Sequence, residues 1–405
     1  MVTFCLSILL LPGLLAEAQT YRFESFPSAR FGFGTNPVGT LIMDGSGNVY
    51  GTTTQGVIYG SGTVFKINRS GKGKVLYTFP GGVNGELPLA GLMRDESGNL
   101  YGTTYNGGSV TCDCGVVFKI DSAGHESVLH SFQGTPDGAN PKSALVRDSA
   151  GNLYGTTVYG GNNSNACGGQ IGCGTVFKID SAGNETVLHS FAGSGDGSYP
   201  FAGLLMDSTG NLYGTTFDGG PFNLGTVFKL DAAGNETVLY NFQGGSDGEV
   251  PVAPLIQDGA GNLYGTTQGG GILECSLGCG TVFKLSSFGV ETVLYRFTGG
   301  DDGSVPRAGL VIDSAGNLYG TASSAGDLSC SVLSGTGCGT VFRIDPEGNE
   351  TTLHVFKGTD GAMPKTGLLR DGAGNLYGTT FEGGSGHCRT EEGDLGCGVI
   401  FKLSR

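Results

Sequence analysis

A single short motif, Gly-Asn-(Leu or Val)-Tyr-Gly-Thr, recurs along almost the whole chain and constrains its fold more than any other feature. Successive copies lie 51 to 59 residues apart, so the repeating unit is nearly constant and only insertions within it vary. Periods of this size are typical of chains that repeat one supersecondary unit. The tyrosines of the seven copies are Tyr50, Tyr101, Tyr154, Tyr213, Tyr264, Tyr319 and Tyr377.

One complete copy, residues 200–242, contains four short apolar runs that are rich in Val, Leu, Phe, Tyr and Thr. The segments 208–210 and 232–235 separate these runs in pairs, and they contain Gly, Ser and Asn, which favour tight turns. No run has the length or the 3.6-residue period of a helix. Each copy is therefore predicted to form two β-hairpins, which together make one four-stranded propeller blade.

The two ends of the repeat region complement each other. Residues 20–26, TYRFESF, resemble the fourth strand of a repeat, whereas residues 398–405, GVIFKLSR, resemble a third strand that lacks its fourth. Pairing these two segments would join the first and last units and leave no unpaired blade edge. The sequence predicts an all-β, seven-bladed β-propeller of four-stranded antiparallel blades, closed by the N-terminal strand. An open solenoid is the alternative.

The N-terminus has the pattern of an export signal. An apolar run from Phe4 to Leu15 precedes Ala16-Glu17-Ala18, the small-x-small pattern of a signal peptidase site. We predict a signal peptide at residues 1–18 and a single propeller domain at 19–405, with an uncleaved anchor as the alternative. No later segment approaches the roughly 20 apolar residues that span a bilayer, so no membrane attachment is expected after cleavage. The predicted location is secreted or periplasmic, by bacterial export.

Composition excludes some partners. The chain contains 78 Gly, but hydrophobic residues make up 38% of it, including 23 Phe and 15 Tyr, so it has enough apolar surface to bury a core. Its formal net charge is −14, with only 22 Lys and Arg along the whole chain. Nucleic acids and anionic membrane surfaces require clustered basic residues. Neither is therefore an expected partner.

The repeat, with its GN(L/V)YGTT, GTVFKID and ETVLHSF segments, resembles the bacterial choice-of-anchor tandem repeat family, also called GloVer repeats. The resemblance covers nearly everything after the signal peptide. The strand order is also similar to that of NHL-type propellers. What the resemblance implies is an exported surface or extracellular protein without an established activity.

Ten cysteines follow the signal segment, and they fall into pairs just before the third strand of five repeats. Both members of the pair are missing from the first and fourth copies, where Ser61 and Leu224 occupy the second position. Joint presence and joint absence in an exported protein predict local disulfides, with zinc binding as the alternative. The expected pairs are Cys112/Cys114, Cys167/Cys173, Cys275/Cys279, Cys330/Cys338 and Cys388/Cys397.

Carboxylates form the one recurring polar feature of the connections between repeats. An Asp precedes a Gly in five copies, at Asp137, Asp196, Asp247, Asp302 and Asp360, with Asn84 in the first copy. Such residues ordinarily shape Asp-Gly turns, but a ring of five could also attract Ca²⁺ or a cationic ligand. No cofactor is predicted, with Ca²⁺ as the alternative. Histidines share a repeat position with tyrosines, for example His130 and Tyr77, so packing on the fourth strand is expected of them.

Loops on one face of the predicted ring are the candidate functional region. The connections between second and third strands vary in length and carry the cysteines, and variable loops on a uniform scaffold are where binding normally resides. Tyr105, Tyr159, Phe217 and Phe381 follow the second strands and could bind a ligand there. We predict a monomeric, non-catalytic binding or scaffold module for an extracellular glycan or protein. The alternative is a glycan-active lyase or hydrolase that uses carboxylates near the central channel. No catalytic residue is assigned.

Overall fold

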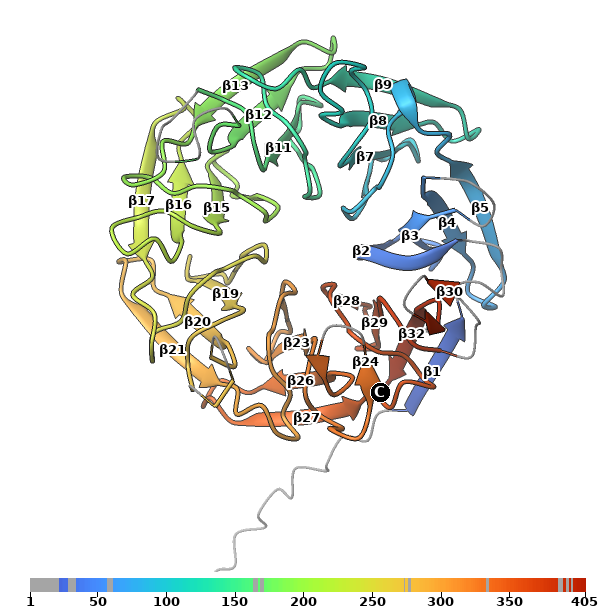
Figure 1. Cartoon of the computed structure of the whole chain (residues 1–405), viewed down its shortest axis with the longest axis vertical. Coiled ribbons are helices and arrows are strands. Elements are labelled where there is room, and N and C mark those ends of the chain that lie inside the picture. Colours follow the sequence, from blue (N-terminus) through green and yellow to red (C-terminus); the bar gives the residue numbers. More distant parts are fainter. Residues whose placement is uncertain are drawn as a thin grey trace, which may run out of the picture.

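Seven four-stranded sheets surround a central axis in the computed structural model (Figure 1). The chain therefore forms the predicted all-β, seven-bladed β-propeller with antiparallel blades. The helical content of the described part is the 3-10 turn η2 (Gly82–Asn84). The structure describes residues 22–27, 34–56, 61–162, 167, 171–272, 274–275, 278–332, 335–384, 389–390, 393–394 and 396–405. The predicted signal peptide at 1–18 lies outside these residues and stays a prediction.

Blades 1 to 6 each follow the chain from the innermost to the outermost strand, whereas blade 7 takes its outermost strand from the N-terminus (Figure 1). Blade 1 contains β2 (Thr35–Met43), β3 (Val49–Gln55), β4 (Thr63–Ile67) and β5 (Gly73–Thr78). Blade 2 contains β6 (Met93–Arg94), β7 (Leu100–Thr104), β8 (Val116–Ile120) and β9 (Glu126–Ser131). Blade 3 contains β10 (Val146–Arg147), β11 (Leu153–Thr157), β12 (Thr175–Ile179) and β13 (Glu185–Ser190). Blade 4 contains β14 (Leu205–Met206), β15 (Leu212–Thr216), β16 (Thr226–Leu230) and β17 (Glu236–Asn241).

The remaining blades repeat this order. Blade 5 contains β18 (Ile256–Gln257), β19 (Leu263–Thr267), β20 (Thr281–Leu285) and β21 (Glu291–Arg296). Blade 6 contains β22 (Val311–Ile312), β23 (Leu318–Ala322), β26 (Thr340–Ile344) and β27 (Glu350–Val355). Blade 7 contains β28 (Leu369–Arg370), β29 (Leu376–Thr379), β32 (Val399–Ser404) and β1 (Arg22–Pro27). Two small hairpins in loops are β24 (Ser331–Val332) with β25 (Gly335–Thr336), and β30 (Arg389–Thr390) with β31 (Gly393–Asp394).

The N-terminal strand closes the ring, as predicted. Strand β1 pairs antiparallel with β32 from Arg22 opposite Ser404 to Pro27 opposite Val399, and it is the outermost strand of blade 7. Blade 1 is also bonded to blade 7, because the amide of Asn36 donates to the carbonyl of Cys397 at 3.0 Å. The two ends of the chain therefore complete one blade, and no blade is left with an unpaired third strand.

The recurring Tyr of the motif holds the turn between the first and second strands. In blade 4, Asp207 accepts hydrogen bonds from the amides of Thr209 and Asn211, and its second carboxylate oxygen accepts from the Asn211 side chain and the Tyr213 hydroxyl. Lys229 lies over the Tyr213 ring at 5.7 Å. The hydroxyl–carboxylate bond recurs in all seven blades, between Tyr50 and Asp44, Tyr101 and Asp95, Tyr154 and Asp148, Tyr213 and Asp207, Tyr264 and Asp258, Tyr319 and Asp313, and Tyr377 and Asp371.

The Gly that follows this Tyr leaves space for the side chain of a buried Phe on the third strand. A Cβ added at Gly214 would lie 2.5 Å from Cζ of the buried Phe228, so only Gly fits there. In blades 2 to 7 this Phe also packs edge-to-face against a buried Phe that follows the outermost strand of the preceding blade, as Phe228 does against Phe191 at 5.1 Å. Edge-to-face aromatic pairs add about 0.5–1.5 kcal/mol each beyond burial. The aromatic core therefore runs from blade to blade.

Threonines of the motif bond neighbouring blades near the axis. Thr52 donates from its hydroxyl to the carbonyl of Ala90 in blade 2 at 2.9 Å, and Thr156 donates to Ala202 in blade 4 at 3.0 Å. Thr379 of blade 7 donates likewise to Pro37 of blade 1 at 3.5 Å, across the closure. These hydrogen bonds join neighbouring blades near the axis. They thereby position the loops that precede the inner strands.

Candidate functional site

The loops between second and third strands carry disulfides where the cysteine pattern predicts them. Four bonds lie within the described residues, with Cα–Cα distances of 5.2 to 5.7 Å. They join Cys112 to Cys114, Cys167 to Cys173, Cys275 to Cys279, and Cys330 to Cys338. Cys397 is also disulfide-bonded, whereas its expected partner Cys388 lies outside the described residues.

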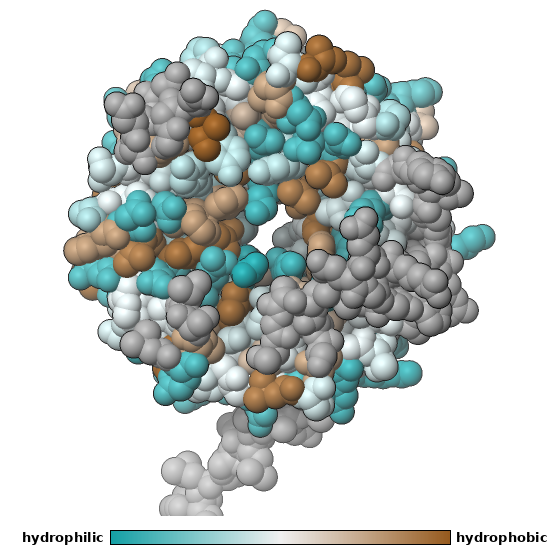
Figure 2. Space-filling view, viewed as in Figure 1, coloured by the Kyte–Doolittle hydropathy of each residue, from teal (hydrophilic) through white to brown (hydrophobic). Residues whose placement is uncertain are grey.

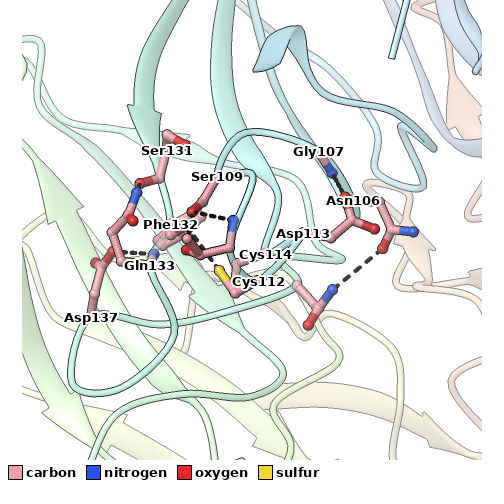
Figure 3. Close-up of a disulfide and its surroundings, with 12 residues drawn as sticks. Asn106, Gly107, Ser109, Cys112, Asp113, Cys114, Ser131, Phe132, Gln133 and Asp137 are labelled. Atoms are coloured by element: carbon pink, nitrogen blue, oxygen red, sulfur yellow. Dashed lines mark hydrogen bonds between the residues drawn. A yellow bond between two sulfur atoms is a disulfide. The ribbon is translucent and has the colours of Figure 1, made fainter. Parts of the chain in front are cut away.

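These disulfides pack against the turn that leads to the next blade. Figure 3 shows Cys112 and Cys114 beside Phe132 and Gln133, with the sulfur of Cys112 3.6 Å from the Phe132 carbonyl oxygen. In blade 5 the sulfur of Cys275 would lie only 2.8 Å from a Cβ placed on Gly299. Blade 1, which has no such pair, uses a hydrogen bond from Ser61 to Glu86 at 2.8 Å instead. The pairs therefore fix the variable loops to the connections on the same face.

The five predicted rim carboxylates each shape their own turn. Asp196 accepts hydrogen bonds from the amide of Ala192 and from the His189 ring, both at 2.9 Å. The other four bond in the same way to an amide three or four residues earlier and to the His or Tyr of the fourth strand. They are Asp137, Asp247, Asp302 and Asp360, with His130, Tyr240, Tyr295 and His354 as the strand partners. The structure places them in five separate blades, and their binding of Ca²⁺ stays a prediction.

A glutamate of the following blade faces several of these pairs of a turn Asp and its His or Tyr partner. Ligand atoms of His130, Asp137 and Glu185 lie within 4.8 Å of one another, although Glu185 begins the outer strand of blade 3. Burial and the Asp137 carboxylate raise the pKa of Glu185 to about 7. The pKa values of Glu291 and Glu350 are raised to about 7 as well, first by burial and then also by Asp247 and Asp302. The sequence signal for this arrangement is the Glu that begins each ETVL segment.

The predicted aromatic residues gather near the axis together with two others. Tyr159 packs edge-to-face against Tyr199 at 5.6 Å, and Phe217 against Phe201 at 5.0 Å. Tyr105 interacts with Tyr159 through its side chain, and burial together with this neighbour raises the pKa of Tyr105. All five rings are half-buried, as is that of Phe381 on the other side of the ring. Sequence reasoning found four of these six residues and missed Tyr199 and Phe201.

Three basic residues face one another across the central opening. Lys142 precedes the inner strand of blade 3, whereas Arg307 and Lys365 precede those of blades 6 and 7, on the opposite side of the ring. Desolvation by the surrounding protein lowers the pKa of each, and electrostatic repulsion from Arg307 adds to the effect on Lys142 and Lys365. The Glu382 carboxylate partly opposes this shift at Lys365. Lys142 and Arg307 nevertheless keep solvent contact. Hydrophilic and hydrophobic surfaces alternate around this opening in Figure 2.

Sequence reasoning missed this basic group, although a signal existed. Each of the three residues directly follows a Pro at the start of a repeat. The same position holds Phe201 in blade 4 and Val or Leu in the other three blades. We call Lys142, Arg307 and Lys365, together with Tyr105, Tyr159, Tyr199, Phe201, Phe217 and Phe381, the axial mouth.

A second concave region lies on the opposite, hairpin face, between blades 7 and 1. This cleft has a volume of about 550 Å³ and is lined by residues of the turns at 44–47, 68–71 and 371–375. Asp44 and Asp371, its acidic lining residues from two of these turns, are already engaged by the motif's Asn and Tyr side chains. These two carboxylates of the cleft therefore serve the turns to which they belong.

The seven four-stranded blades place the chain in the class of seven-bladed β-propellers. Within that class, the Gloeobacter/Verrucomicrobia repeat family matches residues 15–167 and 164–392. These matches cover most of the chain, and the protein belongs to this family. No curated protein matches this chain. No helix in the described part of the chain is long and apolar enough to cross a membrane.

Solved structures with a similar fold come from several kinds of protein. Virginiamycin B lyase from Staphylococcus aureus matches with a TM-score of 0.62 and 14% identity over 95% of this chain and 99% of its own. The extracellular domain of a proposed one-component system from B. thetaiotaomicron matches with a TM-score of 0.56 and 11% identity, over 95% of this chain and 40% of that one. At such identities the similarity establishes the propeller fold alone.

Proposed function

We propose that the protein is an exported, non-catalytic binding module whose ligand binds at the axial mouth. The observation that carries the proposal is the group of half-buried aromatic rings from blades 2, 3 and 4 at the inner edge of the loop face. Partly exposed aromatic rings offer large contact areas at low entropic cost, and tyrosine adds a polar group. An extracellular glycan or protein is the proposed kind of ligand.

Two observations support export. Disulfides form and persist in oxidising compartments, and the loop face carries four of them among the described residues. Similar propellers also occur as extracellular domains of bacterial proteins. Both observations agree with a secreted or periplasmic location.

The arrangement of the carboxylates favours binding over the alternative, a glycan-active lyase or hydrolase. The turn carboxylates are repeated from blade to blade and are occupied by hydrogen bonds to their own strands, for example Asp196 to His189. Catalysis by a carboxylate pair requires two groups with different environments at one place, with a separation matched to the reaction. The turn carboxylates lie instead in five separate blades.

A binding screen with matched aromatic variants tests the proposal. The mature protein would be screened against a panel of bacterial and plant glycans and secreted peptides, and hits would be titrated by calorimetry. The double substitution Tyr159→Ala with Phe217→Ala should weaken binding at least tenfold, because it removes rings from both aromatic pairs. Phe288→Ala is the control, since Phe288 is 94% exposed in a hairpin turn outside the mouth. Equal binding by both variants would place the ligand elsewhere and contradict the proposal.

A further inference from the structure

One of the three basic residues of the axial mouth, Lys365, is attracted by the Glu382 carboxylate, whereas no carboxylate contributes to the pKa shift of Lys142 or Arg307. No ion pair within the described residues includes Lys142, Arg307 or Lys365. Acidic residues outnumber basic ones 36 to 22 in the chain, so three basic side chains gathered at one place are a departure from its average surface. The positions of Lys142 and Arg307 are therefore not explained by neutralisation of neighbouring carboxylates.

Aromatic rings hold two of these cations in place. The ammonium group of Lys142 lies over the Phe201 ring at 4.4 Å, and that of Lys365 lies over the Phe381 ring at 4.0 Å. Cation–π contacts at such distances are favourable, and they limit the freedom of long, flexible side chains. The two positive charges are thus presented from opposite sides of the opening on rigid supports.

Repulsion between these charges opposes their convergence. Lys142 and Lys365 both interact unfavourably with Arg307, and desolvation by the surrounding protein adds to this cost. Like charges in a concave site raise the local positive potential and attract anions. A bound ligand with negative charges on both sides would offset the repulsion.

We propose that the axial mouth binds an acidic oligosaccharide, with carboxylate groups that contact Lys142 on one side and Arg307 and Lys365 on the other. This inference rests on the proposed function and names its ligand class. The cations lie on opposite sides of the ring, so one compact anion contacts them less well than a chain that carries several. A linear uronic-acid chain offers a carboxylate on every sugar, and its apolar sugar faces suit the rings of Tyr159, Tyr199 and Phe217.

Paired titrations test the inference. Tetragalacturonate and neutral galactotetraose would be titrated into the mature protein by calorimetry at 50 mM and 300 mM NaCl. We expect binding of tetragalacturonate alone, and a loss of affinity at the higher salt concentration because salt screens the exposed charges. The double substitution Lys142→Gln with Arg307→Gln should weaken this binding at least tenfold. The control Lys178→Gln with Lys284→Gln removes the same charge from third strands, where each lysine lies over a motif tyrosine, and should change affinity less than twofold.

The outcomes separate this inference from the proposed function. Equal affinity for both saccharides, or unchanged binding in the Lys142/Arg307 variant, overturns the inference. If galactotetraose also binds and loses affinity only in the Tyr159/Phe217 variant, the proposed function stands and the acidic specificity fails. Absence of tetragalacturonate binding overturns the acidic-oligosaccharide assignment. The proposed function is still tested by the wider panel of glycans and secreted peptides. The melting temperature checks that each variant folds, and Lys365→Gln serves as a second, single-charge test.

Discussion

The glutamates between blades should make the stability of the propeller depend on pH near neutrality. Glu185 of blade 3 faces Asp137 of blade 2, and its pKa rises from 4.5 to about 7 through burial and this neighbour. Between these two values the folded protein keeps a proton that the unfolded chain has released. The free energy of unfolding therefore falls as the pH rises from 4.5 to 7, and the full penalty is present above pH 7.

The substitution Glu185→Gln removes the ionisable group but keeps the size of the side chain. One tenfold change in proton affinity corresponds to about 1.4 kcal/mol, which gives an upper bound of about 3.5 kcal/mol for this site. Because Glu185 is only half-buried and solvent screens part of the interaction, we expect a gain of about 1–2 kcal/mol at pH 8. The gain should fall to about a quarter of this value at pH 5. For a chain of this size it corresponds to a rise in melting temperature of roughly 1–3 °C.

Blade 2 provides the matched control for this measurement. Glu126 occupies the equivalent strand position, but it faces Asn84 instead of an Asp and accepts hydrogen bonds from the side chains of Asn84 and Tyr77. Glu126→Gln should therefore give no stabilisation at pH 8. Scanning fluorimetry of both variants and wild type from pH 5 to 8 makes the comparison. A melting temperature of Glu185→Gln that follows wild type at every pH, or equal gains in both variants, would refute the argument.

Three further expectations follow from the architecture. Deletion of residues 19–27 should lower the melting temperature and cause aggregation, since β32 would lose all of its pairing with β1; an unchanged melt would contradict closure by this strand. Non-reducing peptide mapping of the exported protein should find only links within blades, including Cys388 to Cys397, and any cross-blade link would contradict the assignment. If the turn carboxylates bind Ca²⁺, the ion should raise the melting temperature of wild type more than that of Asp196→Asn with Asp247→Asn. Equal responses, or no response, would leave these residues with their turn-forming role alone.

The fold could be predicted because the repeat encodes local geometry that is visible in single residues. A Gly beside each motif Tyr leaves the space that the core Phe fills, and an Asp three residues before the motif's first Gly closes the turn, as Asp207 does. The incomplete strands at the two ends indicated the closure between β1 and β32 without any long-range information. These features depend on contacts within one blade, and a repeated blade displays them seven times.

The site was harder to predict because its contacts lie between blades. Lys142 and Arg307 are far apart in the sequence, and only the curvature of the closed ring brings blade 3 to face blade 6. The Glu that begins each outer strand was visible as a repeated residue, but its position against the preceding blade's Asp depends on how blades pack. Residues that repeat could be recognised from the pattern, whereas their neighbours across a blade boundary could not.

Differences between blades are therefore the best guide to function in a ring of this kind. A residue that every blade shares, such as the motif Tyr or its Asp, is explained by contacts that each blade needs in order to fold. The position after the Pro has no such shared role, since it holds Val38, Leu89 or Val252 in three blades and a cation in three others. A fold requirement would act alike on all seven blades, so the cations at this position call for a different cause. Their convergence on the axis, over aromatic rings, favours a ligand as that cause.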